Sequence, residues 1–220
     1  MLLAIDTSTA ASTAAVLDGE TVLAEVTTLD PRGHSERLAH NVQAALVQAG
    51  CAAADIAAVA VGVGPGPYTG LRIGLVTART FAYLRSVPLH GVCSLDAMAW
   101  QAAAELGLGP DLLVASDARR REVYWARYAG RERVDGPAVD LPAALADRHP
   151  GLPAVGRGGQ LYAGVLGPWA GLDHVRAGWL GRVAQAGLSG PGPGLLLPAD
   201  PLYLRRPDAA EPTAPKPVLA

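Results

Sequence analysis

Hydrophobic runs at the start of the chain predict three strands in succession. Short, mostly apolar runs occupy residues 2–6 and 12–17, and the turn signal Asp18-Gly19 leads into an alternating segment from Thr21 to Thr28. Runs of this length, bounded by turn residues, are typical of strands.

The segments that follow alternate between helical and strand patterns. Between Ser35 and Ala49 apolar residues recur at helical spacing until Gly50 ends the run. The continuous apolar run from Ala57 to Val63 instead suits a strand covered on both faces. The predicted order after the third strand is a helix at 35–49, a strand at 57–63, a helix at 71–84, a strand at 88–92 and a helix at 94–106.

The second half repeats this order in a shortened form. Residues 112–117 echo residues 2–6, and strands are predicted near 123 and at 131–139, a helix at 141–149, a strand at 152–155 and a helix at 160–166. Two βββαβα units predict an α/β chain whose two lobes face each other across a cleft, the actin-like ATPase (ASKHA) architecture. There Asp6 and Asp117 would lie beside nucleotide phosphates. The alternative is that each aspartate caps a strand or turn.

The predicted domains are an N-terminal lobe at 1–106, a shorter C-terminal lobe at 107–205 and a tail at 206–220. Four prolines in the tail oppose a helix or a sheet, so we expect this segment to be disordered.

Charge and cysteine content narrow the class of protein. The 220 residues carry 18 basic and 20 acidic side chains, which removes the strong positive field that bulk nucleic-acid binding requires. Any RNA contact must therefore be local. The two cysteines, Cys51 and Cys93, are too few for a disulfide framework. Because residues 1–6 lack the basic start of a secretory signal and no long apolar span follows, we expect a cytoplasmic protein without a membrane segment.

A Gly/Pro-rich loop connects the strand at 57–63 to the following helix. Its glycines allow a sharp turn, and the helix N-terminus exposes N–H groups that attract anions. It lacks the lysine of a P-loop. It also fails the Rossmann spacing, because the third glycine comes one residue late and no acidic residue lies between Asp55 and Asp96. The candidate residues of this glycine loop are Gly64, Gly66, Tyr68, Thr69, Gly70 and Arg72.

Small residues follow one face of the helix after the loop. Gly74, Ala78 and Ala82 stand four residues apart, so another backbone can approach this strip closely. Packing on the chain's own sheet and docking of a partner subunit are the two interpretations. Our hypothesis is a partner interface made of Leu71, Gly74, Leu75, Ala78 and Ala82.

The glycine loop and helix start, residues 62–74, resemble the TsaB (YeaZ) family of tRNA threonylcarbamoyladenosine synthesis. Collinear similarities support this resemblance over residues 2 to about 205: Leu3–Thr9, His34-Ser35-Glu36, Gly91–Leu95, Asp117–Tyr124 and Pro201–Arg205. Pro67-Tyr68 departs from the family's usual Ser-Phe.

The resemblance implies a non-catalytic subunit that binds TsaD and supports threonylcarbamoyl transfer to N6 of an adenosine beside the tRNA anticodon. It implies no catalytic residue, cofactor or metal in this chain. It also implies contact with the TsaE ATPase through the complex, indirect contact with tRNA and a possible homodimer of the free chain.

Other residues keep alternative functions open. A phosphotransferase would use Asp6 and Asp117 with magnesium, and a peptidase would need a metal or an activated nucleophile. His34 and His40 are six residues apart and point to different faces of one helix, which disfavours a metal pair. His34 with Glu36 is a candidate acid/base pair, but Glu36 is also explained as an acidic residue in a first helical turn. Arg119-Arg120-Arg121 is either a solvated turn or a contact for tRNA or an acidic partner.

Overall fold

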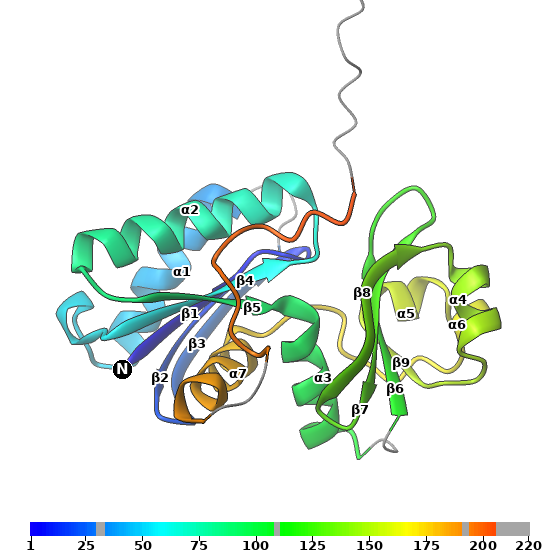
Figure 1. The fold of residues 1–220 in the computed structure, drawn as a ribbon. Helices are drawn as coiled ribbons and strands as arrows, with labels where there is room; N and C mark the ends of the chain where they lie inside the picture. Colours follow the sequence, from blue (N-terminus) through cyan, green and yellow to red (C-terminus); the bar gives the residue numbers. More distant parts are fainter. Residues whose placement is uncertain (30–33, 108–110, 191–193, 206–220) are drawn as a thin grey trace, which may run out of the picture.

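Two β-sheets organise the chain, one in each half of the sequence (Figure 1). The structure is a computed structural model and describes residues 1–29, 34–107, 111–190 and 194–205. The first half contains β1 (Leu2–Asp6), β2 (Ala11–Asp18), β3 (Thr21–Leu29), α1 (His34–Gln48), the 3-10 helix η1 (Ala53–Asp55), β4 (Ala58–Gly64), α2 (Tyr68–Arg85), β5 (Leu89–Cys93) and α3 (Ser94–Glu105). The second half contains β6 (Asp111–Asp117), β7 (Val123–Ala129), β8 (Glu132–Asp140), α4 (Pro142–Arg148), β9 (Ala154–Val155), α5 (Arg157–Leu161), α6 (Ala163–Leu166) and α7 (Ala177–Ser189).

The two sheets share the order of their first four strands, and the first sheet adds a fifth. The first has the order β3-β2-β1-β4-β5 and the second the order β8-β7-β6-β9. In each, the first strand of the unit runs antiparallel to the second and parallel to the fourth. The predicted fold class, a two-lobed α/β chain of duplicated βββαβα units, is confirmed.

Alternation along β1 separates two cores. Successive side chains of a strand point to opposite faces. Leu3 and Ile5 accordingly pack in a core under α1 and α2, whereas Leu2 and Ala4 pack in a core that includes residues of α3 and α7. The first sheet therefore lies between two helical layers (Figure 1).

Helix α3 joins the lobes, because it contacts strands of both sheets. At its first turn the buried Asp96 accepts hydrogen bonds from Tyr128 Oη at 2.6 Å and from Arg133 Nη1 at 3.2 Å. Burial raises the pKa of Asp96, against the opposing effects of Arg133 and Tyr128.

Two features of the second half differ from the predicted elements. The predicted helix at 160–166 is two short helices, because Tyr162 leaves helical geometry at φ −120° and ψ 27°. Helix α7 was not predicted. It lies on the first sheet with the segment after it, so part of the predicted lobe 107–205 packs on the N-terminal lobe. The predicted tail 206–220 lies outside the described residues.

Candidate functional site

The carboxylate of Asp6 is fully buried at the end of β1. Its Oδ1 accepts from the backbone N–H and the hydroxyl of Ser8, each at 2.8 Å, and its Oδ2 accepts from Ser94 Oγ at 2.6 Å. Burial raises the pKa of Asp6, while the hydrogen bonds from Ser94 and Ser8 lower it. Both carboxylate oxygens therefore have partners within the N-terminal lobe.

The glycine loop packs against the turn that follows β1. A Cβ atom on Gly66 would come within 2.4 Å of the Ser8 carbonyl oxygen. On Gly70 it would come within 2.5 Å of the Thr7 carbonyl oxygen, and on Gly74 within 2.4 Å of Thr7 Oγ1. Thr7 Oγ1 also donates to the carbonyl of Gly70 at 2.7 Å. In nucleotide-binding loops, glycines let a phosphate come close to the backbone. Here the chain's own turn after β1 fills that space.

The other side of the glycine loop carries an exposed aromatic pair, Tyr68 and Tyr203. Their ring centroids lie 5.0 Å apart with 27° between the planes, and the Arg72 guanidinium lies 4.5 Å from the Tyr68 centroid. Of the predicted glycine-loop residues, those buried are Gly64, Gly66 and Gly70, and those exposed are Tyr68, Thr69 and Arg72.

Tyr203 belongs to a C-terminal strap, residues 197–205, that crosses from the first lobe to the second (Figure 1). Leu197 pairs with Gly91 of β5, and Leu202 N–H donates to the carbonyl of Val63 at 2.8 Å. Arg205 then reaches the second lobe, where it donates to the Ala118 carbonyl at 2.8 Å and pairs with Glu122 at 2.7 Å. The strap therefore ties the glycine loop to the turn after β6.

That turn contains Asp117 and the three arginines that follow it. Asp117 Oδ1 accepts from Arg119 N–H at 2.8 Å, in the same way that Asp6 accepts from Ser8 N–H. The structure thus shows Asp117 capping a turn. Arg119, Arg120 and Arg121 have φ of 62°, 49° and 64°, and all three are exposed.

The small-residue face of α2 is covered by the chain's own sheet. Leu71, Gly74, Leu75, Ala78 and Ala82 are all buried, at 5% exposure or less for the four that bear a side chain. They pack with Leu3 and Ile5 in the core beneath α1 and α2. The burial contradicts the hypothesis that these five residues contact a partner; the strip lets α2 approach its own sheet.

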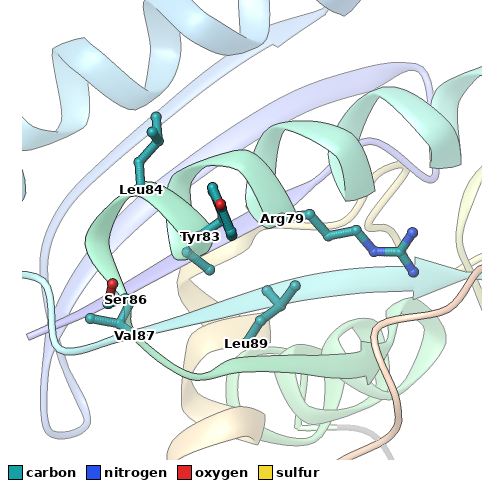
Figure 2. Close-up of a pocket in the computed structure, with 7 residues that line it drawn as sticks. Arg79, Tyr83, Leu84, Ser86, Val87 and Leu89 are labelled. Carbon is teal, nitrogen blue, oxygen red and sulfur yellow. The ribbon is translucent and has the colours of Figure 1, made fainter.

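The opposite face of α2 exposes large apolar side chains. Val76 is 60%, Tyr83 84% and Leu84 72% exposed, and Val47 of the neighbouring α1 is 72% exposed. We call these four residues the outer apolar face. Beside its C-terminal end, between α2 and β5, lies a shallow hollow of about 730 Å³ (Figure 2). It is lined by Arg79, Ala82, Tyr83, Leu84, Ser86, Val87 and Leu89.

Other candidate residues are distributed over the molecule. Burial raises the pKa of the Cys93 thiol to about 12, so this cysteine stays protonated. The side chains of His34 and Glu36 lie outside the described residues. Within the described part of the chain, no three His, Cys, Asp or Glu side chains are grouped to hold a metal ion. None of the described helices has the length and apolar character that a membrane crossing requires.

Known proteins resemble the chain across both lobes. A family model described as TsaD, tRNA N6-adenosine threonylcarbamoyltransferase, matches residues 21–163. The tRNA threonylcarbamoyladenosine biosynthesis protein TsaB of Escherichia coli is 42% identical over 127 residues, which cover 58% of this chain and 54% of that protein. The solved structure of YeaZ from Pseudomonas aeruginosa superposes with a TM-score of 0.77 at 28% identity, covering 92% of this chain and 99% of that one. The chain belongs to the TsaB family.

An uncharacterized protein of Mycobacterium tuberculosis extends the similarity of this TsaB-family chain. It is 44% identical over 210 residues, which cover 94% of this chain and 93% of that protein. The expected resemblance to the TsaB family is confirmed by the Escherichia coli and Pseudomonas aeruginosa proteins, together with its pathway, the biosynthesis of tRNA threonylcarbamoyladenosine.

Sequence reasoning missed two groups of residues in this TsaB-family chain. One is the bridge made by Arg205 to Ala118 and Glu122, although Arg205 ends a segment that carries the family resemblance. The other is the buried ion pair between Asp96 and Arg133. An acidic residue in the first turn of a helix is common, so the sequence did not indicate that Asp96 contacts the other lobe.

Proposed function

We propose that the chain is a non-catalytic subunit that binds TsaD and supports threonylcarbamoyl transfer to N6 of the adenosine beside the tRNA anticodon. The observation that carries the proposal is the outer apolar face of α1 and α2. Large apolar side chains exposed on two neighbouring helices of a folded domain are candidates for an interaction site. Membership of the TsaB family supports a partner within tRNA threonylcarbamoyladenosine synthesis.

The outer apolar face suits a helical partner. Val76 and Tyr83 are one heptad apart on the same side of α2, with Leu84 next to Tyr83 and the exposed Arg79 and Thr80 between them. A partner helix laid along this side of α2 would pack its ridges into the groove between α1 and α2. The hollow beside Tyr83 would accept a side chain at the edge of that contact.

The buried end of β1 supports a non-catalytic role. In a phosphotransferase of this architecture, Asp6 would have to face a metal-bound phosphate. Here its oxygens are bonded to Ser8 and Ser94, and Thr7 lies against the start of α2. Nucleotide binding would require these contacts to break.

Reconstitution of the transfer reaction tests the proposal. Purified TsaD, threonylcarbamoyl-adenylate and unmodified tRNA are assayed alone and with the chain added. We expect modification to rise at least tenfold on addition, and the chain without TsaD to give none. Transfer by the chain alone, or an unchanged rate on addition, contradicts the proposal.

Two related points follow from the same surface. TsaE would associate through the complex, so the chain alone is expected not to capture it. Without TsaD, a second copy of the chain would cover the outer apolar face, which analytical ultracentrifugation would detect as a dimer.

Tight calorimetric binding of ATP to the isolated chain would favour the phosphotransferase alternative.

A further inference from the structure

The exposed aromatic pair stands close to the end of the strap. Tyr68 is 42% and Tyr203 40% exposed, and their stacked rings lie 5.0 Å apart. The backbone under Tyr203 is held by the hydrogen bond from Leu202 N–H to the carbonyl of Val63. Tyrosine rings that combine open apolar surface with a polar tip are enriched at interaction sites. The pair therefore offers fixed aromatic surface to a ligand.

Arg72 adds a positive charge beside the two rings. Its guanidinium lies 4.5 Å from the Tyr68 centroid, and it makes no ion pair with another residue that the structure describes. The carboxylate of Asp200 in the strap is paired instead with Arg79, at 2.6 Å. Proline-rich segments dock on surfaces lined by aromatic rings, and carboxylates pair with guanidinium groups. The aromatic pair with Arg72 thus suits a proline-rich segment that carries an acidic residue.

The chain's own sequence after the strap has this composition. The tail at 206–220 contains four prolines, at positions 207, 212, 215 and 217. Pro212 and Pro215 have the PxxP spacing, which in the polyproline II conformation places both rings on one side of the segment, about 9 Å apart. Glu211 directly precedes Pro212 and supplies the acidic residue. Binding in this conformation requires neither a helix nor a sheet, so it agrees with the composition of the tail.

The length of the tail allows it to return to the rings. Tyr203 is two residues before Arg205, and the seven residues from Arg205 to Pro212 span up to about 23 Å when extended. A loop this short has a small closure cost and gives its end an effective concentration of about 1 mM. A contact with a dissociation constant of about 0.1 mM would then be about nine-tenths occupied.

We propose that the aromatic pair is the docking site of the chain's own proline-rich tail. Pro212 and Pro215 pack on the rings of Tyr68 and Tyr203, and Glu211 lies beside Arg72. The contact covers the exposed rings without a partner protein, so it goes beyond the proposed function and does not depend on it. A proline-rich segment of another protein would have to displace the tail to reach the same rings.

Lys216 provides a probe of this contact, because it is the only lysine of the chain and lies next to Pro215. Reductive methylation with ¹³C-formaldehyde labels Lys216 and the amino group of Met1 in the full-length chain. The Met1 signal reports overall tumbling, and the Lys216 signal reports the tail. We expect Tyr203→Ala to lower the transverse relaxation rate of the Lys216 methyl groups at least about twofold and to remove their ring-current shift.

Trp169→Ala is the matched control for Tyr203→Ala. It removes an aromatic side chain of similar exposure, 39%, from the second lobe. The Lys216 signals should stay as they are in the wild type. Equal changes in the two variants would show that the tail does not recognise the aromatic pair, and would overturn the proposal.

A variant of the tail keeps the proposal testable if Tyr203→Ala disturbs the strap. Pro212→Ala with Pro215→Ala leaves residues 1–205 unchanged and should release Lys216 to the same extent. Unchanged relaxation of Lys216 in this variant overturns the proposal, whatever Tyr203→Ala does. Wild-type signals that change on dilution would assign the bound tail to a second copy of the chain, and would also overturn the contact within one chain.

Discussion

Among the glycines in the part of the chain that the structure describes, Gly62 of β4 is the most tightly enclosed. A Cβ atom there would lie 1.8 Å from Asp6 Oδ2 and 2.7 Å from Ser94 Oγ. We predict that Gly62→Ala lowers the free energy of unfolding by about 3 kcal/mol, because it overpacks the core and breaks the bond between these side chains. Urea denaturation measures the change.

Gly164→Ala in α6 is the matched control for Gly62→Ala. Nothing lies within 4 Å of a Cβ added at Gly164, which is in a helix. We expect this substitution to be neutral or stabilising by up to about 1 kcal/mol. Equal losses in the two variants would show that the contact with Asp6 is not the cause.

Asp6 also makes stability depend on pH. Burial raises its pKa above the usual 3.8, so the folded state holds the proton more tightly than the unfolded state. The resulting stabilisation is fully present below pH 3.8 and is lost as the pH rises through the folded pKa. We predict that wild-type stability minus Asp6→Asn stability falls as pH rises above 3.8, measured by urea titrations at each pH. A difference that grows with pH would contradict this.

The sequence predicted where these residues lie but not what they touch. Asp6 and Asp117 end the first strand of each unit, as the repeat indicated. Whether the glycines receive a ligand or the chain itself depends on Thr7, which is 63 residues from Gly70. Local patterns carry no information about such a distant contact.

Among the elements, helix α2 has one face buried against the first sheet and one face exposed to solvent. Ala78 is 0% exposed against the first sheet, whereas Thr80 on the same helix faces solvent. We predict that Ala78→Asp unfolds the chain or costs more than about 3 kcal/mol, because it buries an unpaired charge. Thr80→Asp should stay within about 0.5 kcal/mol. Thermal melts followed by circular dichroism would show the difference; a stable Ala78→Asp variant would contradict the packing.

Helical spacing alone does not tell which face of α2 is covered. Leu71 and Leu75 make one side of the helix apolar, and Val76 and Leu84 make the other side apolar, so the position of the sheet decides which side is buried.

Helix α7 was not predicted for a different reason. Gly178 and Gly181 weaken a helical pattern, yet they let α7 approach the first sheet, where an added Cβ at 181 would lie 2.4 Å from Leu17.

On the scale of the whole molecule, the strap couples the two lobes. Arg205 is 22% exposed and makes the contacts to Ala118 and Glu122. We predict that Arg205→Ala costs about 2 kcal/mol and speeds amide hydrogen exchange in the turn at residues 118–122. Arg148→Ala, which removes an ion pair to Asp140 within the second lobe, should leave exchange in the turn at residues 118–122 unchanged. Equal exchange in both variants would contradict the coupling.

The two-lobed plan was predictable because each unit repeats the same element order. The return of the chain to the first lobe was not, since residues 176–205 follow the second unit in sequence. The ties that fix this return are single contacts between distant residues, such as Arg79 with Asp200 at 2.6 Å and Arg176 with Glu25 at 2.7 Å. Such contacts produce no repeat or periodicity in the sequence from which they could be predicted.

The most direct test of the account is the affinity between this chain and TsaD, measured by isothermal titration calorimetry for wild type, Tyr83→Arg and Leu161→Arg. Tyr83 is on the outer apolar face, and Leu161 is an exposed apolar residue of the second lobe. The account predicts that Tyr83→Arg folds normally and weakens binding at least tenfold, while Leu161→Arg binds like wild type. Undiminished binding by a folded Tyr83→Arg variant would contradict it.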